Sequence, residues 1–171
     1  AIAPAGAAPT HKVAVPRTLA FPGADIKLTP VTALPMGAWL SIARQDERFA
    51  VTAQGWHVPL VHLAPIKARQ PDYVAVAEHF LHAPYLWGGK TRLGLDCSGL
   101  VQLSLQAAGI DAPRDSDMQA AEVGVPLAIG DGSGGLQRGD LVCWAGHIGI
   151  MTDATTLLHA NATHMAVARG P

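Results

Sequence analysis

The spacing of hydrophobic and polar positions changes along the chain, and its first part favours short strands. Between residues 13 and 64, brief apolar runs are separated by turn residues such as Pro22-Gly23 and Gln54-Gly55. Several short runs at this spacing predict a small antiparallel barrel. The expected strands are 13–15, 38–42, 48–52 and 56–61.

The pattern then changes to longer apolar stretches with helical spacing, after a linker expected at 64–71. Asp72 can cap a helix that extends to about residue 82. A second helix is expected from about Cys97 to Ala108, where Gly109 can end it. Because this second segment is apolar nearly all round, we expect it to be buried.

A third helix and a group of strands are predicted in the last part of the chain. Ser116-Asp117-Met118-Gln119 has the form of a capping box, which starts a short helix that Gly124 can end. The glycine-rich segment 130–135 is expected to be a flexible loop. The strands expected after it are 141–144, 147–152, 156–160 and 165–168, joined by tight connections. Helices followed by an antiparallel meander predict an α+β fold.

The charge balance argues against several classes of partner. The chain has 171 residues and a formal net charge of −1, and no basic patch stands out along it. Nucleic acid and anionic membrane surfaces are therefore not expected as partners. No apolar run is long enough to span a membrane. Because the chain starts without Met and stops just after an expected strand, we expect that sequence is missing at both ends.

The two cysteines, Cys97 and Cys143, are too few to predict a disulfide framework. Cys143 lies in an apolar run over 141–144 and is expected to be a buried small hydrophobic residue. Cys97 lies where a glycine-rich loop is expected to turn into an apolar helix. The N-terminal end of a helix carries partial positive charge, which stabilises a thiolate and makes it a usable nucleophile.

Two histidines in strand-like runs, His147 and His159, can supply what a thiol nucleophile needs. If their strands pair, both side chains can reach one face and act as base and orienting group for Cys97. The same three side chains could instead bind zinc, although the closely spaced ligand pair typical of zinc sites is absent. Neither phosphate-loop motif is present among the glycines around Cys97.

In their order along the chain, these residues resemble the motifs of the NlpC-type cell-wall cysteine peptidases. The motifs are Tyr85-Leu86-Trp87-Gly88-Gly89, Leu95-Asp96-Cys97-Ser98-Gly99-Leu100-Val101, Arg114-Asp115-Ser116, Arg138-Gly139-Asp140-Leu141 and Gly146-His147-Ile148-Gly149-Ile150. The resemblance implies an α+β, papain-like domain over 72–171, with helices packed on an antiparallel sheet and its final strands expected to be cut short. It also implies a small SH3-like β-barrel over 11–64, joined by a linker over 65–71.

The resemblance implies a role for each candidate site residue. Cys97 corresponds to the nucleophile, His147 to the base and His159 to the polar third member. Tyr85 is implied to lie beside the thiol, where its hydroxyl could support the oxyanion together with the N–H of Cys97. The implied substrate-binding residues are Asp96, Ser98, Ser116 and Trp87. No metal or other cofactor is implied.

Asp96 poses an electrostatic question, because a carboxylate beside Cys97 opposes formation of the thiolate. We therefore expect Asp96 to point away and pair with a cation, such as the free α-amino group of a peptide. The alternative is that Asp96 caps the helix that starts at Cys97, and one residue could do both.

The implied function is hydrolysis of murein stem peptides through a thioacyl-enzyme, at the bond between γ-D-glutamate and a diamino acid, with a free N-terminal L-Ala. Recycling of imported peptides in the bacterial cytoplasm is favoured over action outside the cell. Two other classes stay open: an inert module that binds wall peptides, and a thioester acyltransferase on a related fold. The sequence predicts neither the preferred diamino acid nor the oligomeric state.

Overall fold

The computed structural model describes residues 8–127 and 135–171 and divides the chain into two compact units, Ala1–Ala68 and Arg69–Pro171. The boundary between the units falls within the linker predicted at 65–71. Most of the predicted flexible loop at 130–135 lies outside the described residues.

The first unit consists of short antiparallel strands and one 3-10 turn. The strands are β1 (His11–Val13), β2 (Arg17–Ala20), β3 (Thr32–Pro35), β4 (Trp39–Leu40), β5 (Ile42–Gln45), β6 (Phe49–Thr52), β7 (His57–Pro59) and β8 (Leu63–Pro65), with the turn η1 (Leu60–His62). They pair in the orders β4-β1-β8, β2-β3 and β5-β6-β7. This agrees with the predicted class of small antiparallel unit, whereas the likeness to an SH3 barrel stays a prediction.

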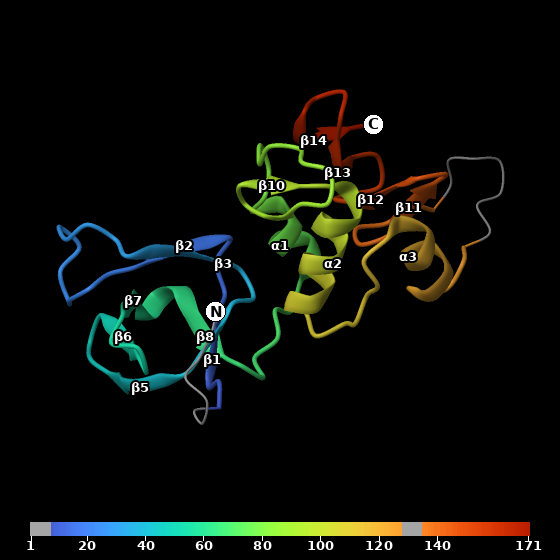
Figure 1. Ribbon diagram of the computed structural model, residues 1–171. Coiled ribbons are helices and arrows are strands. Elements are labelled where there is room, and N and C mark those ends of the chain that lie inside the picture. Colours follow the sequence, from blue (N-terminus) through green and yellow to red (C-terminus); the bar gives the residue numbers. More distant parts are fainter. Residues whose placement is uncertain (1–7, 128–134) are drawn as a thin grey trace. The chain divides into compact units, whose positions relative to one another are not determined.

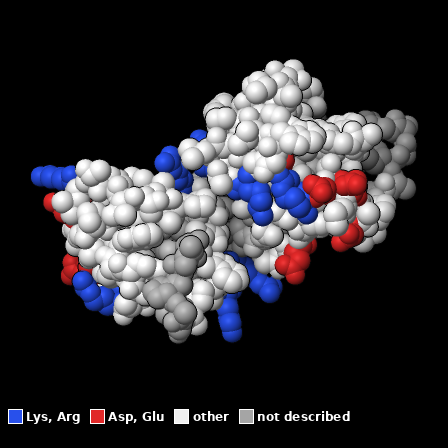
Figure 2. Space-filling model, in the orientation of Figure 1, with Lys and Arg blue, Asp and Glu red and all other residues white. Residues whose placement is uncertain are grey.

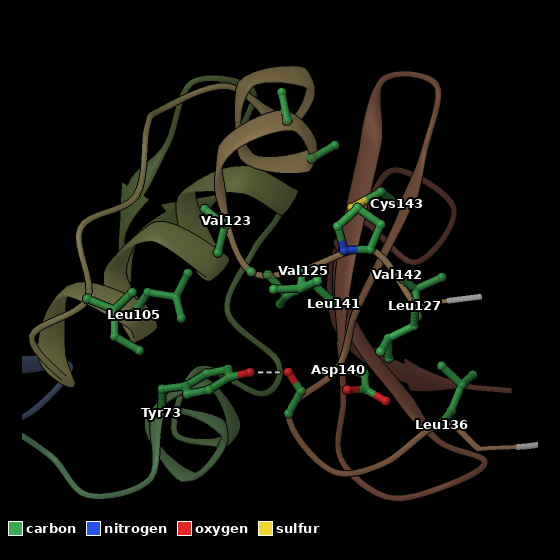
Figure 3. Close-up of a pocket in the computed structure, with 16 residues that line it drawn as sticks. Tyr73, Leu105, Val123, Val125, Leu127, Leu136, Asp140, Leu141, Val142 and Cys143 are labelled. Atoms are coloured by element: carbon green, nitrogen blue, oxygen red, sulfur yellow. Dashed lines mark hydrogen bonds between the residues drawn. The ribbon is translucent and has the colours of Figure 1, made fainter. Parts of the chain in front are cut away.

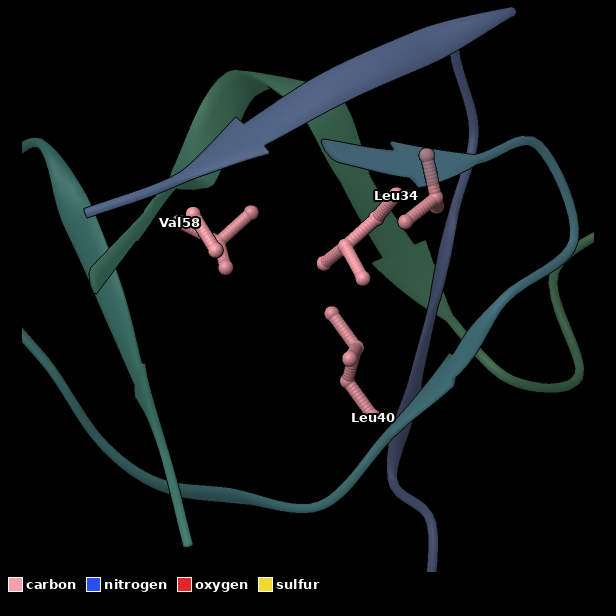
Figure 4. Packing of buried hydrophobic residues seen from close by; sticks show 5 residues of the cluster. Leu34, Leu40 and Val58 are labelled. Carbon is pink, nitrogen blue, oxygen red and sulfur yellow. The ribbon is translucent and has the colours of Figure 1, made fainter. Parts of the chain in front are cut away.

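A compact apolar cluster holds the first unit together. Its buried members come from strands β1, β2, β3, β4 and β7; they are Val13, Ala20, Leu34, Leu40 and Val58. Figure 4 shows the side chains of Leu34, Leu40 and Val58 directed into the space between the strands. Burying one valine or leucine side chain stabilises the fold by about 1.5–3 kcal/mol relative to leaving it exposed. The alternation of buried and exposed positions along β2 places the buried side chains of that strand toward this cluster.

Two features of the first unit differ from the sequence prediction. The hairpin of β2 and β3 was not predicted, because its strands are short and flanked by prolines. Strand β8 extends into the predicted linker, since Ala64 pairs with Lys12 and Pro65 pairs with His11 of β1. Proline fits there because it ends the strand.

In the described part of the second unit, helices pack on an antiparallel sheet (Figure 1). The helices are α1 (Tyr73–Glu78), α2 (Cys97–Ala107) and α3 (Ser116–Glu122), and a short hairpin of β9 (Lys90–Thr91) and β10 (Gly94–Leu95) precedes α2. The sheet has the order β11-β12-β13-β14, with β11 (Leu141–Trp144), β12 (His147–Met151), β13 (Leu157–Asn161) and β14 (Ala166–Gly170). Helix α2 packs against β12 and β13, and α1 packs against α2.

Helix α2 follows the prediction closely. Its side chains are buried along nearly the whole helix, and the following Gly109 has a φ of 80°, as expected of a residue that ends a helix. Helix α1 is shorter than predicted. Although Asp72 caps it, the helix ends at Glu78, because the next residues form turns and His82 then pairs with Val167.

The capping box predicted at the start of α3 is wrong. Asp115, not Ser116, is the N-cap residue, and it makes no side-chain cap hydrogen bond. The Gln119 side chain is instead buried and donates hydrogen bonds to the carbonyl oxygens of Ser98 and Pro113. Gln119 therefore ties α3 to the first turn of α2 and cannot reach back to its own helix start.

Candidate active site

Cys97 is the first residue of α2, and its side chain is 8% exposed. The first N–H groups of a helix have no partner within the helix, and together with the helix dipole they favour a negative charge nearby. The position of Cys97 therefore agrees with the environment predicted for a thiolate.

Two glycines allow the preceding loop to lie directly on the start of this helix. A Cβ atom added to Gly99 would lie 2.3 Å from the carbonyl oxygen of Gly89, a distance at which the backbone would have to move. A Cβ atom added to Gly89 would in turn lie 2.4 Å from the carbonyl oxygen of Gly94. The glycine-rich sequence around Cys97 is thus required by this close backbone contact.

Asp96 is the N-cap residue of α2, as one of the sequence alternatives predicted. Its Oδ1 accepts a hydrogen bond of 2.7 Å from the N–H of Gly99, and its Oδ2 accepts one of 2.7 Å from the N–H of Gly88. The cation that pairs with Asp96 is Arg114, at 2.6 Å from Oδ2. Burial would raise the pKa of Asp96, but the hydrogen bonds from Arg114, Gly99 and Gly88 outweigh it and lower that pKa.

Arg114 was not predicted as a site residue, although it belongs to one of the family motifs. Its second nitrogen, Nη1, donates a hydrogen bond of 2.7 Å to Ser98, whose hydroxyl also lies 3.4 Å from Asp96. The buried side chains of Asp96 and Ser98 therefore belong to one network with Arg114, which is itself partly exposed. Their predicted role in binding substrate stays a prediction.

The other predicted substrate-side residues lie around the loop that precedes α2 and at the start of α3. Tyr85 is partly buried, and burial, followed by the negative charges of Cys97 and Asp96, raises the pKa of its hydroxyl. Trp87 is 84% exposed. Ser116 is the first residue of α3 and is partly buried. The implied place of the Tyr85 hydroxyl beside the thiol, and its part in supporting the oxyanion, stay predictions.

His147 and His159 lie on neighbouring antiparallel strands, β12 and β13, and their rings meet on one face of the sheet. The Nε2 atom of His147 lies 2.8 Å from the Nδ1 atom of His159. The predicted meeting of the two side chains is therefore confirmed. Because Nε2 of His147 is engaged in this contact, its Nδ1 is the nitrogen left to exchange a proton with a thiol.

The two imidazoles are held in a setting that disfavours their charged forms. Burial lowers the pKa of His147. Burial, and then the positive charges that His147 and His164 would carry, lower the pKa of His159. The neutral forms of both rings therefore persist to lower pH than in a free histidine.

These lowered pKa values predict a loss of stability in mild acid. Below the ordinary histidine pKa of 6.5, the unfolded chain binds protons that the two histidines of the native chain do not bind. The free energy of unfolding therefore decreases as the pH is lowered. We expect the unfolding temperature of the parent protein to fall more from about pH 7.5 to 5 than that of the variant His147→Gln/His159→Asn. In the variant, neither of these two positions can bind a proton in this range. Thermal unfolding followed by circular dichroism measures this. Asp96 makes no contribution in this window, because its pKa lies below 3.8. Parallel curves for the two proteins would contradict the prediction.

Trp144 is a neighbour of the histidine pair that sequence reasoning missed. It pairs with His147 across the turn between β11 and β12, where Gly146 has a φ of 75°. The two rings lie 5.5 Å apart at an angle of 41°, and Trp144 is 50% exposed. The strand register that brings them together could have been anticipated from the two-residue connection between Trp144 and His147.

The prediction that Cys143 is buried is wrong. The residue lies on β11, which is an edge strand of the sheet, and its side chain is exposed. Its thiol lines a largely apolar pocket of about 590 Å³ between α3 and β11 (Figure 3). Desolvation in this setting raises the pKa of the Cys143 thiol. Since none of the predicted catalytic or substrate-binding residues lines this pocket, it is separate from the candidate active site.

The zinc alternative required Cys97, His147 and His159 to converge as ligands. Within residues 8–127 and 135–171, no group of three or more His, Cys, Asp and Glu side chains is arranged to hold a metal ion.

On the face drawn in Figure 2, basic and acidic side chains form small groups between larger areas of other residues. None of the helices in the described part of the chain has both the length and the apolar character of a membrane span.

Residues 82–169 match the NlpC/P60 family, and the chain belongs to that family. The γ-D-glutamyl-L-lysine dipeptidyl-peptidase of Bacillus subtilis is 30% identical in an alignment of 160 residues, and the match covers 84% of this chain and 49% of that protein. The NlpC/P60 domain of the peptidoglycan hydrolase SagA is 31% identical, with a TM-score of 0.50, and the match covers 57% of this chain and 85% of that one.

The likeness of fold extends beyond the family match. The crystal structure of an NlpC/P60 family protein from Bacillus cereus matches 95% of this chain and 58% of that one, with a TM-score of 0.76 and 21% identity. This match shows a shared fold. The chain spans about half the length of the curated relatives it matches.

Proposed function

We propose that this chain is a cysteine peptidase that hydrolyses the stem peptides of peptidoglycan through a thioacyl-enzyme. Cys97 is the nucleophile, His147 the base and His159 the orienting group. The observation that carries the proposal is the 2.8 Å contact between Nε2 of His147 and Nδ1 of His159, on the strands against which α2 packs. Membership of the NlpC/P60 family and the names of its relatives support the same reaction class.

The proposed reaction follows from the way each group is held. Nδ1 of His147 takes the thiol proton, and the Cys97 thiolate attacks the peptide carbonyl carbon. The N–H of Cys97, at the start of α2, and the Tyr85 hydroxyl donate to the oxyanion that forms. His147 then gives its proton to the leaving amine, and later removes one from the water that hydrolyses the thioester. Throughout, Nδ1 of His159 accepts the Nε2–H of His147 and so stabilises the imidazolium.

The proposed bond joins γ-D-glutamate to a diamino acid in a peptide that begins with a free L-Ala. The name of the Bacillus subtilis relative, a γ-D-glutamyl-L-lysine dipeptidyl-peptidase, supports this choice. The carboxylate of Asp96, next to Cys97, also supports this choice, because it can attract the α-ammonium group of the peptide. Because Asp96 already pairs with Arg114, an ammonium group would add to an existing ion pair. The bacterial, cytoplasmic location stays a prediction.

We expect the protein to release L-Ala-γ-D-Glu from L-Ala-γ-D-Glu-L-Lys or from its diaminopimelate counterpart. Acetylating the terminal amine should lower kcat/KM about ten- to a hundredfold, because acetylation removes a charge that Asp96 attracts and adds bulk. Mass spectrometry of the products identifies the bond, and the Cys97→Ala variant is the control. Cleavage at another bond, or equal values of kcat/KM for free and acetylated peptides, would contradict the proposed specificity.

A further inference from the structure

The residue before the proposed nucleophile carries a charge of the unfavourable sign. Asp96 precedes Cys97 directly, is buried, and is ionised in the arrangement described above. A neighbouring negative charge destabilises a thiolate. The helix dipole of α2 acts in the opposite direction, but Asp96, as its N-cap, already occupies that end of the helix. The site therefore requires a further positive charge.

Arg114 provides that charge and contacts the residues on both sides of Cys97. One nitrogen lies 2.6 Å from Asp96, and another donates to Ser98 at 2.7 Å. The first nitrogen also lies 3.4 Å from the carbonyl oxygen of Gly89, in the loop against the helix start. The guanidinium group thus joins the loop to both neighbours of the thiol, in the forked geometry that only arginine offers.

Electrostatics agree with this geometry. The hydrogen bond to Asp96 is the main cause that raises the pKa of Arg114, and the charge of Cys97 adds in the same direction. The guanidinium group and the thiolate therefore stabilise each other. Tyr85 on the preceding loop also interacts with the charge of Cys97, and Asp115 and Lys90 lie near Arg114. Among the ion pairs of the described residues, the partner of Asp96 is Arg114.

We propose that Arg114 is a positioning residue for the nucleophile: it cancels the charge of Asp96 at the sulfur of Cys97 and fixes the loop against α2. This inference rests on the proposed function, in which Cys97 reacts as a thiolate. It gives Asp96 and Arg114 opposite effects on the same sulfur. A role confined to holding the fold together would not produce such opposite effects.

The pH dependence of iodoacetamide alkylation measures the thiolate of Cys97 without any peptide substrate. The Cys143→Ala background ensures that Cys97 alone reacts, since these are the two cysteines of the chain. Arg114→Met should lower the rate of Cys97 alkylation near neutral pH about tenfold, because the sulfur then lies beside Asp96 without a compensating positive charge. Asp96→Asn should raise that rate or leave it unchanged. The double variant Arg114→Met/Asp96→Asn should return close to the starting value.

Two further variants separate charge from geometry. Arg114→Lys keeps the charge but cannot donate to Asp96 and Ser98 at once, so an intermediate value is expected. Lys90→Met removes a nearby charge that makes no ion pair with Asp96, and it should change the alkylation rate of Cys97 less than Arg114→Met does. If Arg114→Met unfolds the protein, the double variant keeps the test open, because it leaves no buried unpaired carboxylate.

The outcomes distinguish this inference from the proposed function. An alkylation rate of Cys97 that is the same with and without Arg114, or a double variant that reacts as slowly as Arg114→Met, would overturn the positioning role. If Cys97 reacted no faster than an ordinary free thiol in every variant, its assignment as nucleophile would fail, and the proposed function with it. A double variant that returns to the starting value, together with a reactive Cys97, supports both the positioning role of Arg114 and the proposed function.

Discussion

Replacing Cys97 by alanine is expected to lower kcat/KM for the stem peptide by roughly a thousandfold or more, because the covalent intermediate can no longer form. Folding should be little affected. The substitution removes one atom at the start of α2, while the cap by Asp96 and the Gly89–Gly99 contact remain. The measurement is turnover of L-Ala-γ-D-Glu-L-Lys together with the unfolding temperature.

The matched control for this prediction is Cys143→Ala. Since Cys143 is exposed on the edge strand β11 and lines a separate pocket, its removal should leave turnover within about twofold of the parent. Cys97→Ser should also be nearly inactive, because a hydroxyl at this position is a much poorer nucleophile. An active Cys97→Ala protein beside an inactive Cys143→Ala protein would reverse the assignment.

Loss of His147 is expected to cost much more activity than loss of His159. His147→Ala removes the only nitrogen that can exchange a proton with the thiol in the proposed mechanism, a loss of roughly a thousandfold or more. His159→Ala leaves a base without its acceptor for Nε2–H, and about ten- to a hundredfold is expected. Values of kcat/KM for the two variants, measured with the same peptide, provide the comparison.

A conservative variant tests whether His159 acts through the contact seen here. The Oδ1 atom of asparagine occupies nearly the place of the histidine Nδ1 and can accept the hydrogen bond from His147. His159→Asn should therefore retain more activity than His159→Ala. If the two were equally impaired, the 2.8 Å contact would not be the source of the effect. Equal losses for His147→Ala and His159→Ala would contradict the division into base and orienting group.

The sequence predicted those features that depend on a local pattern. Helix α2 was predicted because an apolar run leads to Gly109, and strands β11 to β14 because tight turns separate their apolar runs. The short hairpin of β9 and β10 was not predicted. The pairing of His147 with His159 followed from strand alternation once β12 and β13 were expected to be neighbours.

The features that were missed depend on contacts between segments distant in the chain. The capping pattern at Ser116 did not predict that the side-chain amide of Gln119 would donate a hydrogen bond to the carbonyl oxygen of Ser98, in the first turn of α2. The apolar run around Cys143 has the composition of a buried strand, but an edge strand has a neighbour on one side alone. The partner of Asp96 could not be chosen from sequence, because Arg114 is separated from it by the whole of α2.

The proposed nucleophile and the proposed base are supplied by different stretches of the second unit. The contacts described around Cys97 come from residues between Tyr85 and Gln119, whereas the two histidines and Trp144 lie within residues 144–159. A chain divided between α3 and β11 would give two fragments, each with half of the chemistry. Turnover would then return only when the fragments reassemble, which makes this fold a candidate for a complementation reporter of molecular association.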